Sequence, residues 1–267
     1  MSAPWFVHLW RAHRWRLAIV AVALAAWGAL LPIIFDAFGE QFEALMDSGI
    51  IPSQFAQFGG GDIFSLTGSV SLGFIHPIAV GLVLVFAVGF AGSSIAGERQ
   101  RGTLEVLLAR PLSRRGLVVT VFTTSVVFVG VTTAALTLGT FIGTALVGRL
   151  DELGAGNLPI LWLNATLLFV AFAAISLAAS VSFDRLTPAI GVSLAVVLVS
   201  YFLDTIGQLW PDAAFLQTYS LVHYLDARAA LAGLPDPADF AVLAAVIAIA
   251  VAYALVAFPR RDLAAPS

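Results

Sequence analysis

The chain has 267 residues, of which 60% are hydrophobic and only 11% are charged, and its mean hydropathy is +0.98. Soluble domains are roughly 45–50% apolar, so this composition indicates an integral membrane protein. The chain has no cysteine, which excludes disulfides, iron–sulfur clusters and thiolate metal sites, and its net charge of −3 gives no reason to expect a nucleic-acid partner.

The first part of the chain predicts an interfacial helix followed by a span. Residues 4–16 interleave tryptophans with arginines and histidines, a mixture typical of a helix at the membrane surface. The uncharged run 17–35 is long enough to cross a hydrocarbon core of about 30 Å. Residues 36–71 then carry acids but no basic residue, and their apolar side chains recur with helical spacing, which predicts an interfacial helix on the outer surface.

Five further apolar runs complete six predicted spans, and these five lie at about 72–96, 116–147, 159–183, 188–206 and 237–258. His76-Pro77 should bend the second span. The third span would be about 48 Å long as a helix, so it should project beyond the bilayer or be broken. The aromatic-rich segment 208–235 predicts short interfacial helices in the loop between the fifth and sixth spans. Residues 1–267 are therefore expected to form a single all-α transmembrane domain.

The basic residues predict the orientation. All thirteen are arginines, and all except Arg149 and Arg228 fall on one side of the predicted spans. Six spans place both termini on that same side. Because cytoplasmic loops carry the excess of basic residues, both termini are expected to be cytoplasmic.

Catalytic and ion-coupling chemistry is missing from the sequence. No Walker sequence occurs, so we expect that the chain does not hydrolyse ATP by itself and binds no cofactor or metal. No charge lies in the middle of a span, which argues against an ion-coupled transporter or a proton pump. His76 and Asp204 could line a substrate path or gate, although a hydrogen-bonded interfacial histidine and a helix-end acid are the simpler interpretations.

The segment 97–115 is the longest charged stretch, and it lies between the second and third spans. Gly102 and Thr103 can begin a helix, with Thr103 as N-cap and Glu105 in the first turn, and Pro111 would end it. We therefore predict a short helix over about 102–111. One face of it, at i, i+3 and i+4 spacing, consists of Leu104, Leu107 and Leu108. Spacing alone allows either a solvated loop resting on lipid headgroups or a docking element for a cytoplasmic partner.

The same segment carries a resemblance to a known family. It reads Glu98-Arg99-Gln100-Arg101-Gly102-Thr103-Leu104-Glu105, then Leu107-Leu108, then Pro111-Leu112-Ser113-Arg114. This resembles the coupling helix in membrane subunits of ATP-binding-cassette (ABC) exporters of the type-2 permease superfamily. Residues 258–263 resemble the closing signature of those permeases, and residues 219–233 resemble the outer segment before their last span. One departure is the run 118–120, Val-Val-Thr, where many relatives carry a lysine.

The resemblance implies a permease subunit that exports a drug, lipid, peptide or ion across the bacterial cytoplasmic membrane. Its partners would be two ABC ATP-binding subunits, which hold ATP and Mg, and a second permease copy or a paralogue. The leucines would anchor the coupling helix in a cleft of the ATPase, and Glu98, Arg99, Arg101 and Glu105 would orient it. The ATPase-coupling residues implied are Glu98, Arg99, Arg101, Gly102, Thr103, Leu104, Glu105, Leu107, Leu108, Pro111 and Arg114. The alternative is a non-transporting membrane scaffold or regulatory subunit that binds a cytoplasmic partner through the same loop.

Overall fold

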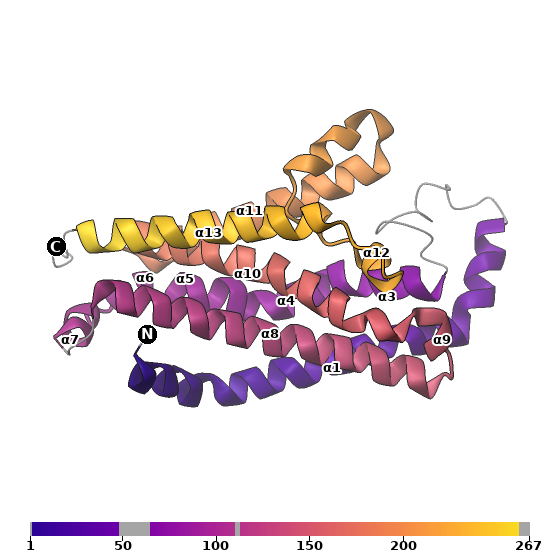
Figure 1. Cartoon of the computed structure of the whole chain (residues 1–267), viewed down its shortest axis with the longest axis horizontal. Helices are drawn as coiled ribbons and strands as arrows, with labels where there is room; N and C mark the ends of the chain where they lie inside the picture. Colours follow the sequence, from indigo (N-terminus) through magenta and orange to yellow (C-terminus); the bar gives the residue numbers. More distant parts are fainter. Residues whose placement is uncertain (1, 48–64, 110–112, 262–267) are drawn as a thin grey trace.

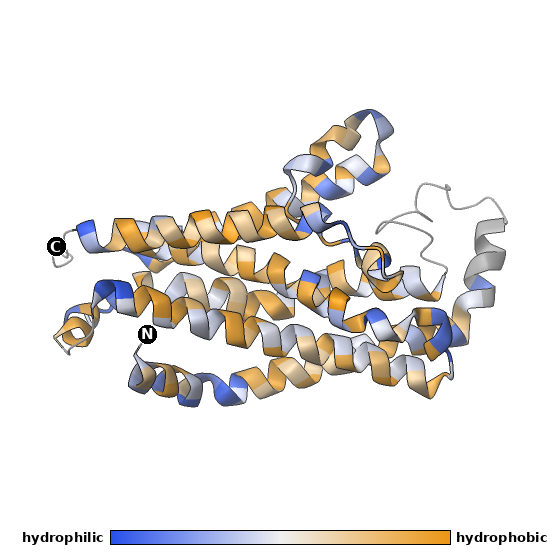
Figure 2. Ribbon diagram, viewed as in Figure 1, coloured by the Kyte–Doolittle hydropathy of each residue, from blue (hydrophilic) through white to orange (hydrophobic). Residues whose placement is uncertain are grey.

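A computed structural model describes residues 2–47, 65–109 and 113–261, and within them every regular element is a helix. Six helical segments are long and apolar enough to cross a membrane. They lie side by side, with both termini at one end of the bundle (Figure 1). Hydrophobic residues dominate the length of these helices, and hydrophilic residues gather toward the two ends of the bundle (Figure 2). The chain is thus an all-α, six-span integral membrane protein, as predicted.

The first span differs from its prediction. Helix α1 (Ala3–Asp47) is one continuous helix of 45 residues, so the segments predicted as an interfacial helix over 4–16, a span over 17–35 and an outer helix after residue 35 follow one another without interruption. Pro4 lies in the first turn of α1, where proline fits, and Pro32 is the only proline in its interior, so neither expected boundary carries a strong helix breaker. Figure 1 shows the end of α1 turning away from the bundle. The amphipathic composition of a segment indicates that it lies at the membrane surface, but it does not indicate whether the helix is interrupted there.

The second span is interrupted, as the His76-Pro77 pair predicted. It begins earlier than expected, with α3 (Leu66–Ile75), and α4 (Pro77–Leu84) follows after His76 adopts an extended conformation with ψ of 139°. A residue before proline is disfavoured in helical geometry, while proline itself fits the first helical turn. His76 Nδ1 then accepts a hydrogen bond from Ile78 N at 3.3 Å. A π-helical turn, η1 (Val85–Phe90), and a short α5 (Ala91–Ser93) complete the span.

The third span, α8 (Arg114–Leu146), is a single helix of 33 residues, about 50 Å long at about 1.5 Å per residue. It packs closely against α1 through glycines. A Cβ added to Gly139 would overlap the carbonyl oxygen of Ala25, and one added to Gly143 would overlap that of Ala29. The Gly139-x-x-x-Gly143 pair therefore permits this close approach, because only hydrogen atoms fit between the two backbones.

Threonine hydroxyls along α8 bond mainly to carbonyls of their own helix, which satisfies them inside the bundle. The hydroxyls that do so belong to Thr120, Thr124, Thr132, Thr133, Thr137, Thr140 and Thr144. One of them also crosses between spans, because Thr133 Oγ1 lies 2.7 Å from Thr166 Oγ1 in a buried position. Their structural role is thus accounted for without a ligand.

Helix α10 (Leu158–Ser182) is the most buried span and contacts α8, α11 (Leu186–Leu209) and α13 (Pro237–Arg260). Asp236 caps α13 by accepting from Ala238 N at 2.8 Å. At the end of the bundle opposite the termini lie α9 (Leu150–Leu153) and the 3-10 turn η2 (Ala155–Asn157).

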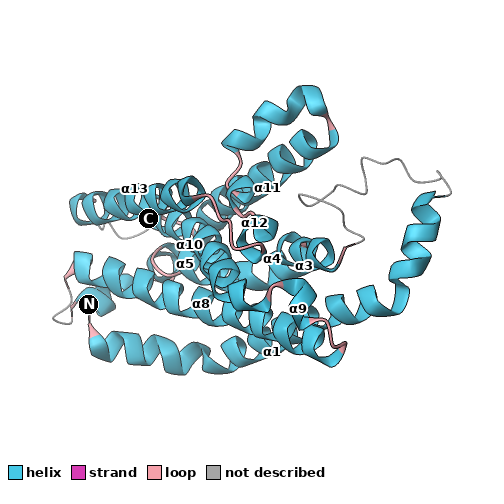
Figure 3. Cartoon of the chain, turned by 45° about the vertical axis from the view of Figure 1, so that its right-hand side comes forward, coloured by secondary structure: helices cyan, strands magenta, loops and turns pink. Residues whose placement is uncertain are grey.

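The predicted helices between the last two spans are present as short elements. They are η3 (Pro211–Tyr219), η4 (Val222–Tyr224) and α12 (Ala227–Leu231). Together with the end of α11, η3 forms a helical hairpin that projects from the bundle (Figure 3). Residues 48–64 of the first predicted outer loop lie outside the described residues.

Candidate functional site

The chain reverses between the second and third spans through two short helices, α6 (Ala96–Gln100) and α7 (Leu104–Leu108), at the end that carries both termini (Figure 1). Ser94 and Ile95 form a turn between α5 and α6. Ser180 Oγ of α10 accepts hydrogen bonds there from the backbone nitrogens of Ile95 at 3.1 Å and Ala96 at 2.9 Å. The start of α6 is therefore fixed to the central helix of the bundle.

Arg99 points into the bundle instead of toward a partner. It is only 5% exposed, and its Nη1 donates to Asp184 Oδ1 at 2.7 Å. The same carboxylate oxygen accepts from Arg261 Nη2 at 3.0 Å, and Arg261 Nη1 donates to the carbonyl of Val181 at 2.7 Å. Burial, followed by the nearby positive charge of Arg261, lowers the pKa of Arg99, and Asp184 opposes that shift.

This cluster of Arg99, Asp184 and Arg261 joins α6 to the turn after α10 and to the end of α13. The Arg99 side chain is thus engaged within the chain, and its predicted contact with an ATPase stays a prediction. Sequence reasoning missed the partners, because Asp184 and Arg261 are 85 and 162 positions away from Arg99 and no local pattern links them.

Glu98 organises the turn into α7. Its carboxylate accepts hydrogen bonds from Arg101 and, at 2.5 Å, from Thr103 Oγ1. Gly102 has φ of +70°, a left-handed conformation that glycine adopts without strain. Thr103 occupies the N-cap position of α7 as predicted, but its hydroxyl bonds back to Glu98 and does not cap the helix. Because Glu98, Arg101 and Thr103 satisfy one another, the turn has a defined shape.

The leucine face of α7 lies against the chain itself. Leu104 is 2% and Leu107 is 8% exposed, and both belong to the hydrophobic core, against which Leu108 also packs. The prediction that the three share one face is confirmed, and that face packs against the rest of the chain. Their predicted role as anchors in a partner's cleft stays a prediction. The opposite face presents Glu105 and Val106, and Val106 is 68% exposed.

The end of the segment is tied to the last span. Ser113 caps α8 by accepting from Gly116 N at 3.0 Å. Arg114 Nη1 donates to the carbonyls of Pro259 at 3.1 Å and Arg261 at 2.7 Å. Arg114 therefore holds the start of α8 to the end of α13. Pro111, which was predicted to end the short helix, lies outside the described residues.

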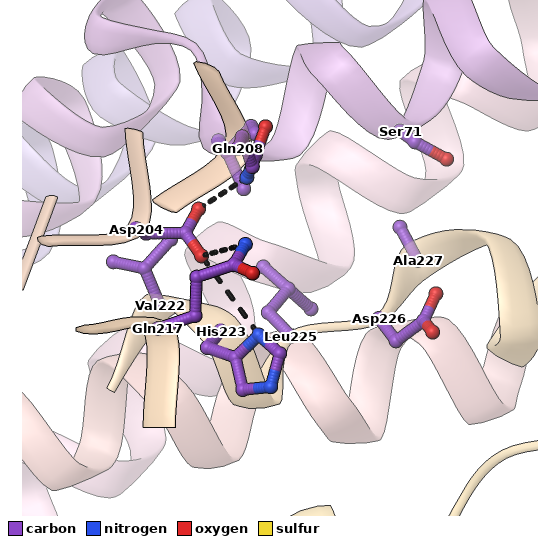
Figure 4. A pocket seen from close by; sticks show the side chains of 10 residues that line it. Ser71, Asp204, Gln208, Gln217, Val222, His223, Leu225, Asp226 and Ala227 are labelled. Carbon is purple, nitrogen blue, oxygen red and sulfur yellow. Dashed lines mark hydrogen bonds and ion pairs between the residues drawn. The ribbon is translucent and has the colours of Figure 1, made fainter. Parts of the chain in front are cut away.

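The two residues predicted for a substrate path lie in different settings. The His76 ring lies against the ring of Trp27, with centroids 4.7 Å apart and planes tilted by 38°. Asp204 is 5% exposed and lines a cavity that His76 does not border. Figure 4 shows Asp204 surrounded by Gln208, Gln217 and His223. Gln208 lies four residues after Asp204 in the same helix, so helical spacing could have predicted that contact. Gln217 and His223 come from separate turns, and no local spacing indicates that they lie near Asp204.

Among the described residues, no group of three or more His, Asp or Glu side chains could hold a metal ion. The comparison with curated proteins found no significant match. The family model described as ABC-2 family transporter protein matches residues 14–263, nearly the whole chain. Together with the six spans, this match shows that the chain belongs to the ABC-2 transporter family and is a multi-pass permease subunit of an ATP-binding-cassette transporter.

Proposed function

We propose that this permease exports a substrate across the bacterial cytoplasmic membrane and takes its energy from separate ATPase subunits that dock on the 97–115 segment. Two such subunits, each with ATP and Mg, and a second permease, identical or paralogous, would complete the transporter. Both termini and α7 would then lie in the cytoplasm, as the distribution of arginines favours.

One observation carries the proposal: α7 has an apolar side buried in the bundle and another side that is open. A short helix fixed on one side can accept a partner on the other without losing its own packing. The open side holds Glu105 and the exposed Val106, and Arg101 lies next to it with 59% of its side chain exposed. We infer that these side chains, instead of the leucines, contact the ATPase.

The hydrogen bonds around α6 and α7 suggest how a movement of the ATPase would reach the spans. Arg99 connects α6 to Asp184, and Arg114 connects the start of α8 to the end of α13. A push on α7 would therefore act on α10 and α13 together as well as on the two spans that flank it. A flexible loop would absorb the same displacement, because few of its contacts are fixed.

The test is co-purification of the full chain with an ABC ATP-binding subunit from the same genome. Val106→Asp puts a second carboxylate beside Glu105 on the open side of α7 and should abolish the association, because burying an unpaired carboxylate against a partner is costly. Leu234→Asp is the matched control, since Leu234 is 78% exposed in the turn after α12, at the opposite end of the bundle.

Both variants should keep the melting temperature of the unmodified chain, which separates docking from folding. The proposal fails if the Val106→Asp complex co-purifies intact, or if Leu234→Asp releases the ATPase while Val106→Asp retains it. ATP hydrolysis by the reconstituted complex should be lost in the same variant that loses the ATPase.

A further inference from the structure

We propose that the cavity around Asp204 is a binding site for a small organic ammonium ion. The cavity lies where the end of α11 meets η3, η4 and the start of α12, and α3 forms its far wall with Ser71 and Ile75. Its volume is about 160 Å³. The inference concerns binding by the permease chain alone and goes beyond the transport function proposed above.

The Asp204 carboxylate is buried, and one of its oxygens has few partners. Its side chain is only 8% exposed. Oδ2 accepts from Gln208 Nε2 at 2.5 Å, whereas among the described residues Oδ1 accepts only from Gln217 Nε2, at 3.5 Å, the outer limit of a hydrogen bond. His223 Nδ1 is 3.9 Å from Oδ1, too far for a hydrogen bond. A positively charged donor near Oδ1 would stabilise this buried carboxylate.

Asp226 supplies a second carboxylate on the other side of the cavity (Figure 4). Its Oδ1 caps α12 by accepting from Ala229 N at 2.9 Å, and the other oxygen takes no part in that cap. Among the described residues that line the cavity, none is an arginine, and His223 adds positive charge only when it is protonated. The lining therefore favours a cation with several N–H donors, and an ammonium group has three.

The rest of the lining limits the size and character of the ligand. Ile75, Val222, Leu225 and Ala227 form an apolar part of the wall. A cavity of about 150 Å³ is known to hold benzene, so this one has room for about six non-hydrogen atoms. A short alkyl chain that ends in an ammonium group satisfies both parts of the wall, whereas a bare metal ion would leave the apolar part uncovered.

The experiment is isothermal titration calorimetry of n-butylammonium into the full chain in lipid nanodiscs, with empty nanodiscs as the background. n-Butanol is the neutral probe of equal size. We expect saturable binding of the ammonium ion and at least about tenfold weaker binding of the alcohol, because hydrogen bonds to charged groups dominate such a site. Asp204→Asn should weaken ammonium binding about tenfold as well, since it keeps the shape of the side chain and removes its charge.

Asp226→Asn tests the cavity without changing the buried Asp204. The substitution should leave the fold intact, since asparagine also caps helices and Asp226 is exposed. It should weaken binding severalfold. Asp212→Asn is the matched control, because Asp212 is an exposed acid of η3 that does not line the cavity, and it should change nothing.

Three results would overturn the proposal: equal binding of the alcohol and the ammonium ion, undiminished binding by both cavity variants, or no saturable heat above empty nanodiscs at millimolar probe. Because the assay contains no ATPase, its failure leaves the docking proposal intact. Loss of docking in Val106→Asp likewise leaves amine binding untouched.

Discussion

Replacing Asp184 with alanine should destabilise the chain more than replacing Arg99 with methionine, although both changes break the same ion pair. The two side chains are unequally buried: that of Arg99 is 6% exposed and that of Asp184 is 67% exposed. In the Asp184→Ala variant a buried guanidinium loses its partner, while in Arg99→Met the charge and its demand for a partner disappear together.

The magnitude follows from what each variant leaves behind. Breaking a buried pair by removing one partner costs about 3–5 kcal/mol, and a hydrogen bond to a charged group contributes about 1.5–3 kcal/mol. Because Asp184 is mostly exposed, we expect about 2 kcal/mol for Asp184→Ala. Nε and Nη2 of Arg99 already have no hydrogen-bond partner among the described residues, so methionine should cost about 1 kcal/mol or less.

The lowered pKa of Arg99 also indicates that its positive charge reduces the stability of the folded chain. Burial lowers its pKa in the folded chain below the ordinary value, so the folded state holds that proton less firmly than the unfolded state does. Charged Arg99 therefore subtracts from stability at every pH below its folded pKa, which includes neutral pH. Removing the charge by substitution removes that cost.

The assay is thermal unfolding of the purified chain, followed by tryptophan fluorescence at one heating rate. At about 2 °C per kcal/mol for a chain of this size, Asp184→Ala should lower the melting temperature by about 4 °C and Arg99→Met by about 2 °C or less. Exposed Asp212→Ala serves as a control for the loss of a surface carboxylate. The reasoning is refuted if Asp184→Ala melts with the unmodified chain, or if Arg99→Met melts lower than Asp184→Ala.

Three further predictions concern packing. Gly139→Ala should cost roughly 1–3 kcal/mol, because its Cβ overlaps the backbone of α1, whereas Gly130→Ala, which has open space, should not lower the melting temperature. Thr133→Val and Thr166→Val, measured singly and together, should show a coupling energy of about 0.6 kcal/mol, and a value of zero would contradict their buried hydrogen bond. Leu107→Asp should abolish the folded peak in gel filtration even without an ATPase, because it buries an unpaired charge.

The six spans could be predicted from the sequence because the bilayer imposes a local rule. A run of about twenty apolar residues is long enough to cross, and no information from elsewhere in the chain is needed to recognise it. The break at His76-Pro77 was equally local, since it depends on the backbone geometry of neighbouring residues. The motif around Gly102 likewise indicated the family, because its residues are contiguous in the sequence.

The sequence could not show what lies against each surface. Helical spacing put Leu104 and Leu107 on one face, but only the folded chain decided that this face packs inward and that Val106 faces out. Periodicity specifies which residues share a side of a helix, not what covers that side.

The tertiary structure likewise decided which residues pair with the buried charges. Arg99 meets Asp184, and Asp204 meets Gln217 and His223, because separate helices end at the same level of the bundle. Such meetings depend on helix packing across many residues, and no spacing in the chain encodes them.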